Sequence, residues 1–152
     1  MVGSRWYADH LTREELAKID AMVNMDTLGL GPTEIWQSRA HPILTGVMIR
    51  VAGSMHLPVS GVNVEKVGST DSESFVRRKV PSITVHSLTQ KTLAVLHSDR
   101  DRLEAIKMDD YYDSYRLIAA YLAFLDGMPP AEELLRQAKQ EKELLRQRRA
   151  EK

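Results

Sequence analysis

Short apolar runs that alternate with segments of helical spacing constrain this chain more than any other feature of its sequence. Three runs of strand length end at a polar residue or near a Gly or Pro break, at residues 21–26, 34–37 and 81–86. Between them, residues 42–51 place apolar side chains three and four apart, as on one face of a helix. Strands that alternate with helices are typical of layered structures with a largely buried sheet. We therefore predict an α/β fold in which a mixed sheet is flanked by helices, with a further strand within residues 59–67.

Capping motifs mark where several helices begin. Thr12 and Glu15 have the spacing of a capping box, which predicts a short helix that runs to about residue 20. Thr70 and Glu73 have the same spacing and predict a second short helix through residue 76. Pro42 suits the first turn of the helix over residues 42–51.

The last part of the chain divides into an apolar helix and a charged tail. Asp109 or Asp110 is expected to cap the helix, and Gly127 to end it. Its broad apolar face would be formed by Tyr112, Tyr115, Leu117, Ile118, Tyr121, Leu122 and Leu125. We predict a domain part over residues 1–127 and a charged helical tail over residues 128–152. The two leucine pairs of the tail, Leu134-Leu135 and Leu144-Leu145, favour a solvated helix with a weak packing stripe, with coiled-coil pairing as the alternative.

Composition narrows the classes of partner. The chain has 21 basic and 21 acidic residues, so its formal net charge is zero, and we expect neither nucleic acid nor a membrane surface as a partner. It has no cysteine, which leaves His, Asp and Glu as strong metal ligands. Residues 1–5 lack the apolar core of a signal peptide. The compartment stays open, because the protein either remains inside the cell or has an export signal outside these residues.

Asp26, His97 and Asp71 are the candidate site residues. Asp26 follows an apolar strand, where α/β sheets usually place their ligands; the alternative is a turn residue that accepts bonds from local N–H groups. His97 lies in a polar loop, and neutral imidazole is a common zinc ligand; the alternative is a surface histidine. Asp71 begins a short helix and either caps it or faces the site. His86 ends a strand at the same edge, with a structural histidine as the alternative. Motifs for a serine nucleophile or a phosphate loop are absent.

Five short motifs follow one another along most of residues 3–126. They are Gly3-Ser4-Arg5-Trp6-Tyr7, Val23-Asn24-Met25-Asp26-Thr27-Leu28-Gly29, Ser69-Thr70-Asp71-Ser72-Glu73-Ser74-Phe75, Val80-Pro81-Ser82-Ile83 and Leu96-His97-Ser98-Asp99-Arg100-Asp101. In their order and spacing they resemble the carboxy-terminal half of metallopeptidase family 28. This family includes bacterial leucyl aminopeptidases, glutamate carboxypeptidase-type enzymes and glutaminyl cyclases, which share a zinc-exopeptidase-like sandwich of helices around a mixed sheet.

The resemblance implies roles for three residues. Asp26 and His97 match zinc-ligand positions, which serve different ions in two-zinc members, and Asp71 matches a position beside the site. The bridging Asp, a further His, a Glu ligand and the general-base Glu belong to the family's first half, so the resemblance assigns no catalytic residue here. Zinc is therefore expected for a full-length member, with weak or no binding by this chain alone. Leu96 and Thr27 depart from the family's frequent residues near the substrate, so substrate specificity is not implied.

Three functions are consistent with these patterns. The first is the carboxy-terminal portion of a zinc-dependent aminopeptidase or related exopeptidase that acts on peptides. The second is a non-catalytic module that forms a homo-oligomer through an exposed sheet edge or the tail helix. The third is a glutaminyl-cyclase-like transferase on the same scaffold.

Overall fold

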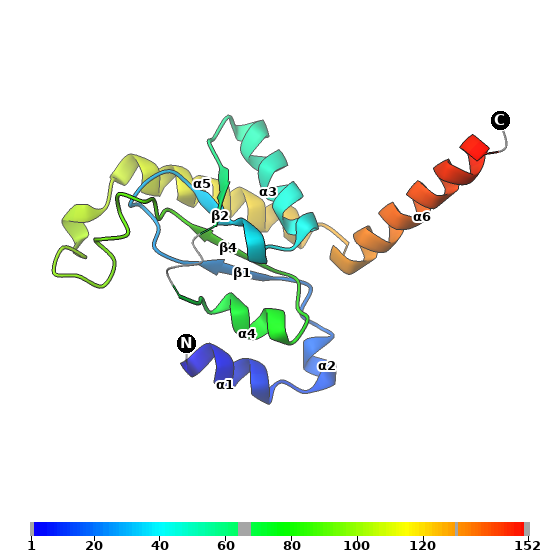
Figure 1. The fold of residues 1–152 in the computed structure, drawn as a ribbon, viewed down its shortest axis with the longest axis horizontal. Helices are drawn as coiled ribbons and strands as arrows, with labels where there is room; N and C mark the ends of the chain where they lie inside the picture. The colour runs from blue at the N-terminus through cyan, green and yellow to red at the C-terminus, as the bar shows by residue number, and fades with distance from the viewer. Residues whose placement is uncertain (1, 64–67, 130, 151–152) are drawn as a thin grey trace.

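The computed structural model describes residues 2–63, 68–129 and 131–150, and the predicted α/β fold is confirmed (Figure 1). Its helices are α1 (Val2–His10), α2 (Arg13–Leu16), α3 (Pro42–Met55), α4 (Ser72–Arg77), α5 (Met108–Asp126) and α6 (Ala131–Ala150), with 3₁₀ turns η1 (Gln37–Arg39) and η3 (Leu103–Ala105). Its strands are β1 (Met22–Met25), β2 (Glu34–Trp36), β3 (Ser60–Val62) and β4 (Ser82–His86). They form a mixed sheet in the order β1-β4-β2-β3, in which β4 is parallel to β1 and antiparallel to β2.

The two faces of the sheet have different chemistry. On one face, Ile35, Ile83 and Val85 pack with the buried side chains of α3 and α5 to form the hydrophobic core. On the other face, Thr84 and His86 are buried although they are polar. Helix α4 covers this second face and α1 packs on α4, while α3 and α5 lie across the first (Figure 1). The sheet therefore has one apolar and one polar buried face.

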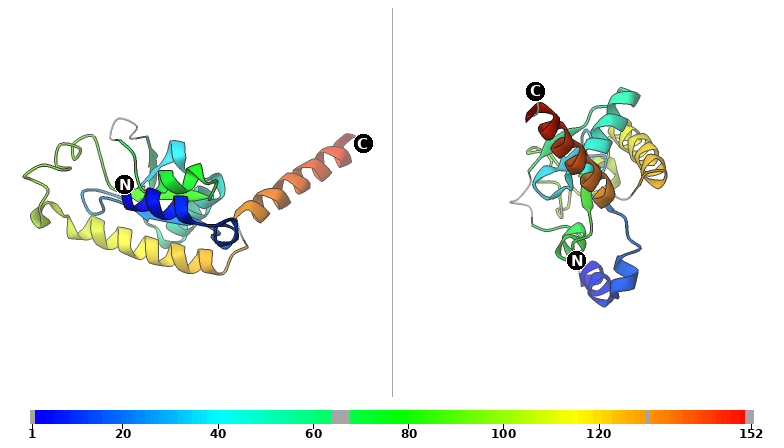
Figure 2. Two further views of the ribbon diagram at one scale, coloured as in Figure 1. Left: turned by 90° about the horizontal axis from the view of Figure 1, so that it is seen from below. Right: turned by 90° about the vertical axis from the view of Figure 1, so that its right-hand side faces the viewer.

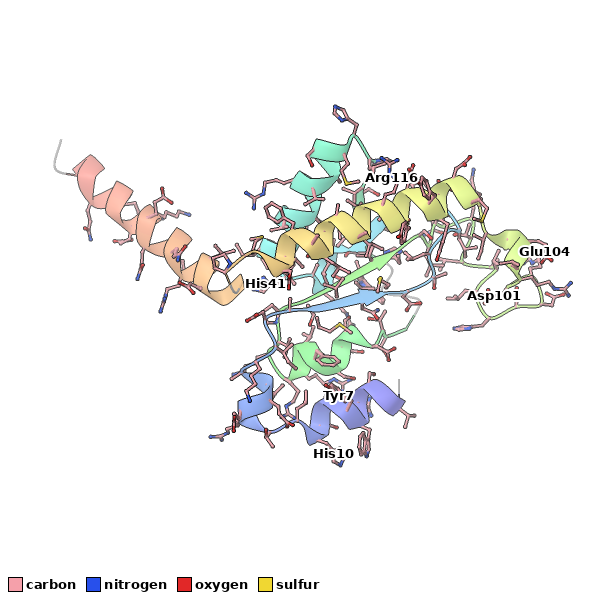
Figure 3. All side chains as sticks on the ribbon, turned by 180° about the vertical axis from the view of Figure 1, so that it is seen from behind. Tyr7, His10, His41, Asp101, Glu104 and Arg116 are labelled. Carbon is pink, nitrogen blue, oxygen red and sulfur yellow. The ribbon has the colours of Figure 1, made fainter. Side chains whose placement is uncertain are left out.

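Helix α1 is held against α4 by three contacts, although the sequence patterns did not predict it. Ala8 is buried, and the ring of Tyr7 lies between the two helices, 6.1 Å from the ring of Phe75 (Figure 3). The Arg78 guanidinium donates hydrogen bonds to the carbonyl oxygens of Ala8 (2.7 Å) and Leu11 (2.9 Å). The carbonyl groups at the end of α1 are thus satisfied by a cation, which also suits the negative end of the helix dipole.

The first capping box is confirmed and the second is wrong. Thr12 accepts from the Glu15 N–H at 3.2 Å, and the Glu15 carboxylate accepts from the Thr12 N–H at 2.8 Å, although α2 ends already at Leu16. At α4 the N-cap residue is Asp71, whose side chain makes no capping bond. Thr70 instead shares hydroxyl hydrogen bonds with its neighbours, and Glu73 forms an ion pair with Arg39.

Two expectations about burial also need correction. The sheet was predicted to be largely buried, but in β1 only Asn24 is buried and Met25 is 53% exposed, because β1 lies at the edge of the sheet. On α5, the residues Tyr112, Tyr115 and Leu122 are exposed, and the core includes Leu117, Ile118 and Tyr121 instead.

The predicted cap of α5 is also wrong. Neither Asp109 nor Asp110 caps the helix, since the N-cap residue is Lys107 and both carboxylates lie in the first helical turn.

The end of the chain forms the predicted helix α6, which projects from the body of the molecule (Figure 2). Leu134 lines a small pocket with Leu125 and Met128, where α6 begins. The side chains of Leu135, Leu144 and Leu145 lie outside the described residues, as do residues 64–67 of the predicted strand that contains β3. In the part of the chain that the structure describes, no helix is both long and apolar enough to cross a membrane.

Candidate active site

A pocket of about 130 Å³ opens at the carboxyl ends of β1 and β4. Asp26 and His97, which are far apart in the sequence, both line it. Its other polar lining residues are Thr27, Trp36, Ser69, Thr70, Thr84 and His86, and its apolar ones are Leu88 and Leu96. The fold therefore brings the two predicted ligand positions to one place, at the sheet edge where α/β proteins bind their ligands.

Asp26 is held in a turn whose backbone is strained. Its N–H donates to the carbonyl oxygen of Val85 at 3.0 Å, which continues the β1–β4 pairing by one residue. The next residue, Thr27, has a φ of 52°, a left-handed conformation that is unfavourable for a β-branched side chain. The Thr27 hydroxyl donates to Oδ1 of Asp26 at 2.9 Å. The turn thus aims an exposed carboxylate at the pocket and fixes one of its two oxygens.

His97 also has left-handed backbone, with a φ of 59°. Its N–H donates to Oδ2 of Asp101 at 3.1 Å, and its imidazole is exposed. Asp101 lies in the long loop that extends beyond the sheet between β4 and α5 (Figure 3). Left-handed conformations of residues other than glycine cluster at functional sites, because the surrounding structure has to maintain them. Both residues predicted as ligands are therefore placed by such segments.

His86 lies deeper in the pocket than the two candidate ligands, with a relative exposure of 2%. Its Nδ1 accepts a hydrogen bond from the Leu88 N–H at 3.1 Å, so the neutral ring carries its proton on Nε2. Burial lowers the pKa of His86, and the Asp26 carboxylate opposes this shift. The Glu34 carboxylate lies 3.7 Å from Nδ1, and burial raises the pKa of Glu34. His86 is therefore neutral, with its Nε2–H as a buried donor.

A cluster of hydroxyl groups forms the pocket wall next to α4. Ser72 Oγ lies 2.8 Å from Thr84 Oγ1 and 2.7 Å from Thr70 Oγ1, and these three side chains form a connected set. Asn24 Nδ2 donates to Thr84 at 3.5 Å. Because a hydroxyl group can both donate and accept a hydrogen bond, this wall can bind either a donor or an acceptor group of a ligand.

Two buried N–H groups near the pocket have no partner. Among the described residues, nothing bonds Nε1 of Trp36 or Nε2 of His86, and Trp36 is 4% exposed. The sequence predicts for Trp36 only a place in a short strand. Its place in the pocket depends on the pairing of β2 with β4, which a local pattern does not show.

The family of this chain follows from a comparison with family models. The model for Peptidase family M28 matches residues 1–122. The chain belongs to peptidase family M28. A comparison with curated protein sequences finds no significant match.

Solved structures share the fold of this M28 chain. BSAP, a zinc aminopeptidase from Bacillus subtilis, gives a TM-score of 0.69 at 19% identity, over 80% of this chain and 31% of its own. An aminopeptidase from Aneurinibacillus sp. strain AM-1 gives 0.63 at 19% identity, over 81% and 29%. A glutaminyl cyclase from an Acidobacteriales bacterium gives 0.67 at 18% identity, over 80% and 44%. The M28 chain therefore spans less than half the length of each of these three structures.

The remaining candidate, Asp71, is exposed at the start of α4 and is not among the residues that line the pocket. From this segment of the chain, Ser69 and Thr70 line the pocket. Within residues 2–63, 68–129 and 131–150, no group of three or more His, Asp or Glu side chains is arranged to hold a metal ion. Since zinc sites in proteins use three or four protein ligands, Asp26 and His97 do not by themselves fit a complete zinc site in this M28 chain.

Proposed function

We propose that this chain is the carboxy-terminal portion of a zinc-dependent aminopeptidase or related exopeptidase, which hydrolyses peptide bonds with metal-activated water. The observation that carries the proposal is the meeting of Asp26 and His97 at one pocket, at the carboxyl ends of adjacent parallel strands. A carboxylate and an imidazole are ligands that suit zinc. Membership of family M28 and the fold shared with zinc aminopeptidases support the same assignment.

The chain alone is expected to be inactive. Two ligand-type side chains hold zinc weakly, because a stable site needs more ligands in a fixed geometry. Among the described residues that line the pocket, Asp26 is the one carboxylate, so the pocket holds no second carboxylate that could act as a general base. Peptide binding and hydrolysis therefore belong, in this proposal, to a protein that includes further segments of the M28 domain.

Zinc content and hydrolysis of aminoacyl-nitroanilides test the proposal. Both are measured for the 152-residue chain and for a version that includes coding sequence upstream of Met1. Zinc and activity are expected only in the longer protein, and Asp26→Asn or His97→Asn is expected to remove both. Asp9→Asn is the matched control, because Asp9 is exposed on α1 and is not among the residues that line the pocket. Equal activity in both lengths would contradict the expected inactivity of the short chain.

A second candidate is a self-associating module, and the edge strand β1 favours it. In the described part of the chain, β1 pairs with β4 on one side only. An unpaired strand edge favours pairing with another chain, which includes a second copy. Light scattering across a concentration series tests this, and a strict monomer at high concentration would exclude it.

The product of the reaction distinguishes the glutaminyl-cyclase alternative from a peptidase. The fold shared with the Acidobacteriales glutaminyl cyclase is the observation that keeps this function under consideration. A pyroglutamate-forming assay on the longer protein gives a positive result only for a cyclase, whereas release of a free amino-terminal residue identifies a peptidase.

A further inference from the structure

A groove of about 590 Å³ lies at the amino end of β4, at the opposite end of this strand from the candidate active site. One side is formed by residues 38–42, where η1 leads into α3, and the other by the end of α4 and residues 79–82. His41 stands at the start of α3 (Figure 3), and its N–H connects the two sides by donating to the carbonyl oxygen of Ser82 at 2.8 Å. The volume lies within the range of about 300–1,000 Å³ that is usual for ligand sites. The groove is large enough for a bound segment and shares no lining residue with the active-site pocket.

Positive charge is concentrated along this groove. Arg39, Arg77 and Lys79 line it and are exposed, whereas Glu73 is the one carboxylate among the described residues that line it. Glu73 forms an ion pair with Arg39 and lies 3.9 Å from Arg77, so two guanidinium groups share one negative charge. Lys79 takes part in neither pair. A protein whose formal net charge is zero thus has an excess of positive charge at one groove, which attracts negatively charged partners.

Apolar side chains line the groove between these charged groups. They are Val76, Val80 and Pro81 on one side, and Ala40 and Pro42 on the other. Among the described residues that line it there is no Phe, Tyr or Trp on which a nucleic-acid base could stack. A membrane surface meets cations that protrude, whereas these cations border a recess. Cations beside apolar surface in a recess fit a peptide segment that has both carboxylates and apolar side chains.

The backbone at Lys79 favours a glycine, yet the chain has a lysine there. Lys79 follows Arg78, the C-cap residue of α4, and has a φ of 63°. Residues in this left-handed conformation after a helix are usually Gly or Asn, because a β-carbon is unfavourable there. The lysine therefore keeps a cation at the groove at a cost in stability, and its charge can be separated from its structural effect by substitution.

We propose that this groove docks an extended segment of a partner protein in which acidic and apolar side chains alternate. Successive side chains of an extended segment point to opposite sides. Its carboxylates would pair with Arg39, Arg77 and Lys79, while its apolar side chains pack on Val76 and Val80. The docking surface is independent of the proposed function, because the groove and the candidate active site lie at opposite ends of β4.

Binding of a defined peptide to the 152-residue chain tests the proposal. The probe is Val-Asp-Val-Asp-Val with acetylated and amidated ends, and Val-Asn-Val-Asn-Val has the same shape without charge. Calorimetric titration at low ionic strength is expected to show that the acidic peptide binds about tenfold more tightly than the neutral one, as two or three exposed ion pairs predict. Added salt should reduce this difference by screening. In ¹H–¹⁵N NMR spectra the N–H signals of Arg77 and Lys79 are expected to shift, and that of Asp26 to stay unchanged.

Three variants separate charge from structure. Lys79→Gly is expected to weaken binding of the acidic peptide about threefold. The same substitution should raise the urea concentration at the midpoint of unfolding, because glycine suits the left-handed backbone. Glu73→Gln keeps an acceptor for Arg39 but removes the competing charge, so it should tighten binding about threefold. Arg50→Gln is the matched control and should change neither property, because Arg50 is exposed on α3 and does not line the groove.

Several results would overturn the docking surface. Equal affinity for the acidic and neutral peptides would do so, as would a Lys79→Gly variant with changed stability but unchanged affinity. Binding to vesicles of phosphatidylcholine and phosphatidylserine, or to inorganic phosphate, without binding of the peptide would assign the cations to a membrane surface or a free anion instead. Self-association in light scattering that Lys79→Gly abolishes, without binding of the peptide, would assign the groove to a second copy of the chain. Peptidase activity of a longer form bears on none of these results.

Discussion

Ser87 binds the carbonyl oxygen of Thr27 twice, through its backbone N–H at 3.1 Å and its hydroxyl at 2.6 Å. The same hydroxyl accepts from the Leu30 N–H at 3.0 Å. Because Thr27 follows Asp26 directly and has left-handed backbone, Ser87 connects the end of β4 to the turn that orients the candidate ligand. One fully buried side chain thus supports a strained turn at the pocket.

Ser87→Ala is expected to destabilise the protein by about 1–3 kcal/mol, since it leaves the buried Leu30 N–H without its acceptor. Urea unfolding followed by circular dichroism measures the change. Ser54→Ala is the control, because the Ser54 hydroxyl donates to the Val51 carbonyl oxygen within its own helix and Ser54 is exposed. A change no larger than that of the control would show that the turn is stable without Ser87.

Arg78 joins α4 to the end of α1, and its removal should loosen α1 selectively. Arg78→Ala loses two charge-assisted hydrogen bonds, to Ala8 and Leu11, and is expected to cost about 2 kcal/mol. Hydrogen exchange should show faster exchange in α1 than in α5. Arg78→Lys keeps the charge but not the planar pair of donors, so it should recover only part of the protection. Uniform loss of protection in both helices would contradict a local role.

The fold class was predictable because each strand and helix has its own local pattern. The strand that ends before Asp26 and the strand that ends at His86 were both identified from short apolar runs, and Pro42 marked the start of α3. The capping box at Thr12 has the predicted bonds because both of its partners lie within one turn of helix. Such features depend on near neighbours in the chain, which a sequence displays directly.

The polar wall of the pocket was not predictable in the same way. In β4, the polar residues Ser82, Thr84 and His86 alternate with Ile83 and Val85, which is the usual pattern of a strand with one solvated face. The structure buries the polar residues instead, because α4 covers them. Which face is covered depends on tertiary packing, and the second capping box failed for the same reason: the hydroxyl of Thr70 found partners on Ser72 and Thr84.

Tyr121 joins the two helices that cover the apolar face of the sheet. It is fully buried on α5, and its hydroxyl donates to the carbonyl oxygen of Leu44 on α3 at 3.2 Å. Tyr121→Phe removes this bond with little change of shape and is expected to cost about 1 kcal/mol, measured by thermal or urea unfolding. Tyr115→Phe is the control, because Tyr115 is exposed on the same helix. Equal stability of the two variants would show that the Tyr121 hydroxyl contributes nothing.

Glu34 is expected to make the free energy of unfolding depend on pH, and its contribution should fall as the pH rises. Burial raises the pKa of Glu34 above its usual 4.5, so the folded protein holds this proton more tightly than the unfolded chain does. The contribution of Glu34 is therefore most favourable below pH 4.5 and is lost as the pH rises through its raised pKa. His86 acts in the opposite sense, because its lowered pKa makes its neutral form favourable above pH 6.5 and unfavourable as the pH falls.

Glu34→Gln separates these two effects. Gln keeps the size of the side chain and removes the buried charge, whose Oε2 has no hydrogen-bond partner among the described residues. The variant should match the wild-type free energy of unfolding near pH 4 and exceed it by about 1 kcal/mol near pH 7. Denaturant unfolding across this pH range measures the difference, with Glu14→Gln, an exposed carboxylate on α2, as the control. A wild-type protein that is more stable than the variant at neutral pH would instead show that ionised Glu34 stabilises the protein through an attraction to His86.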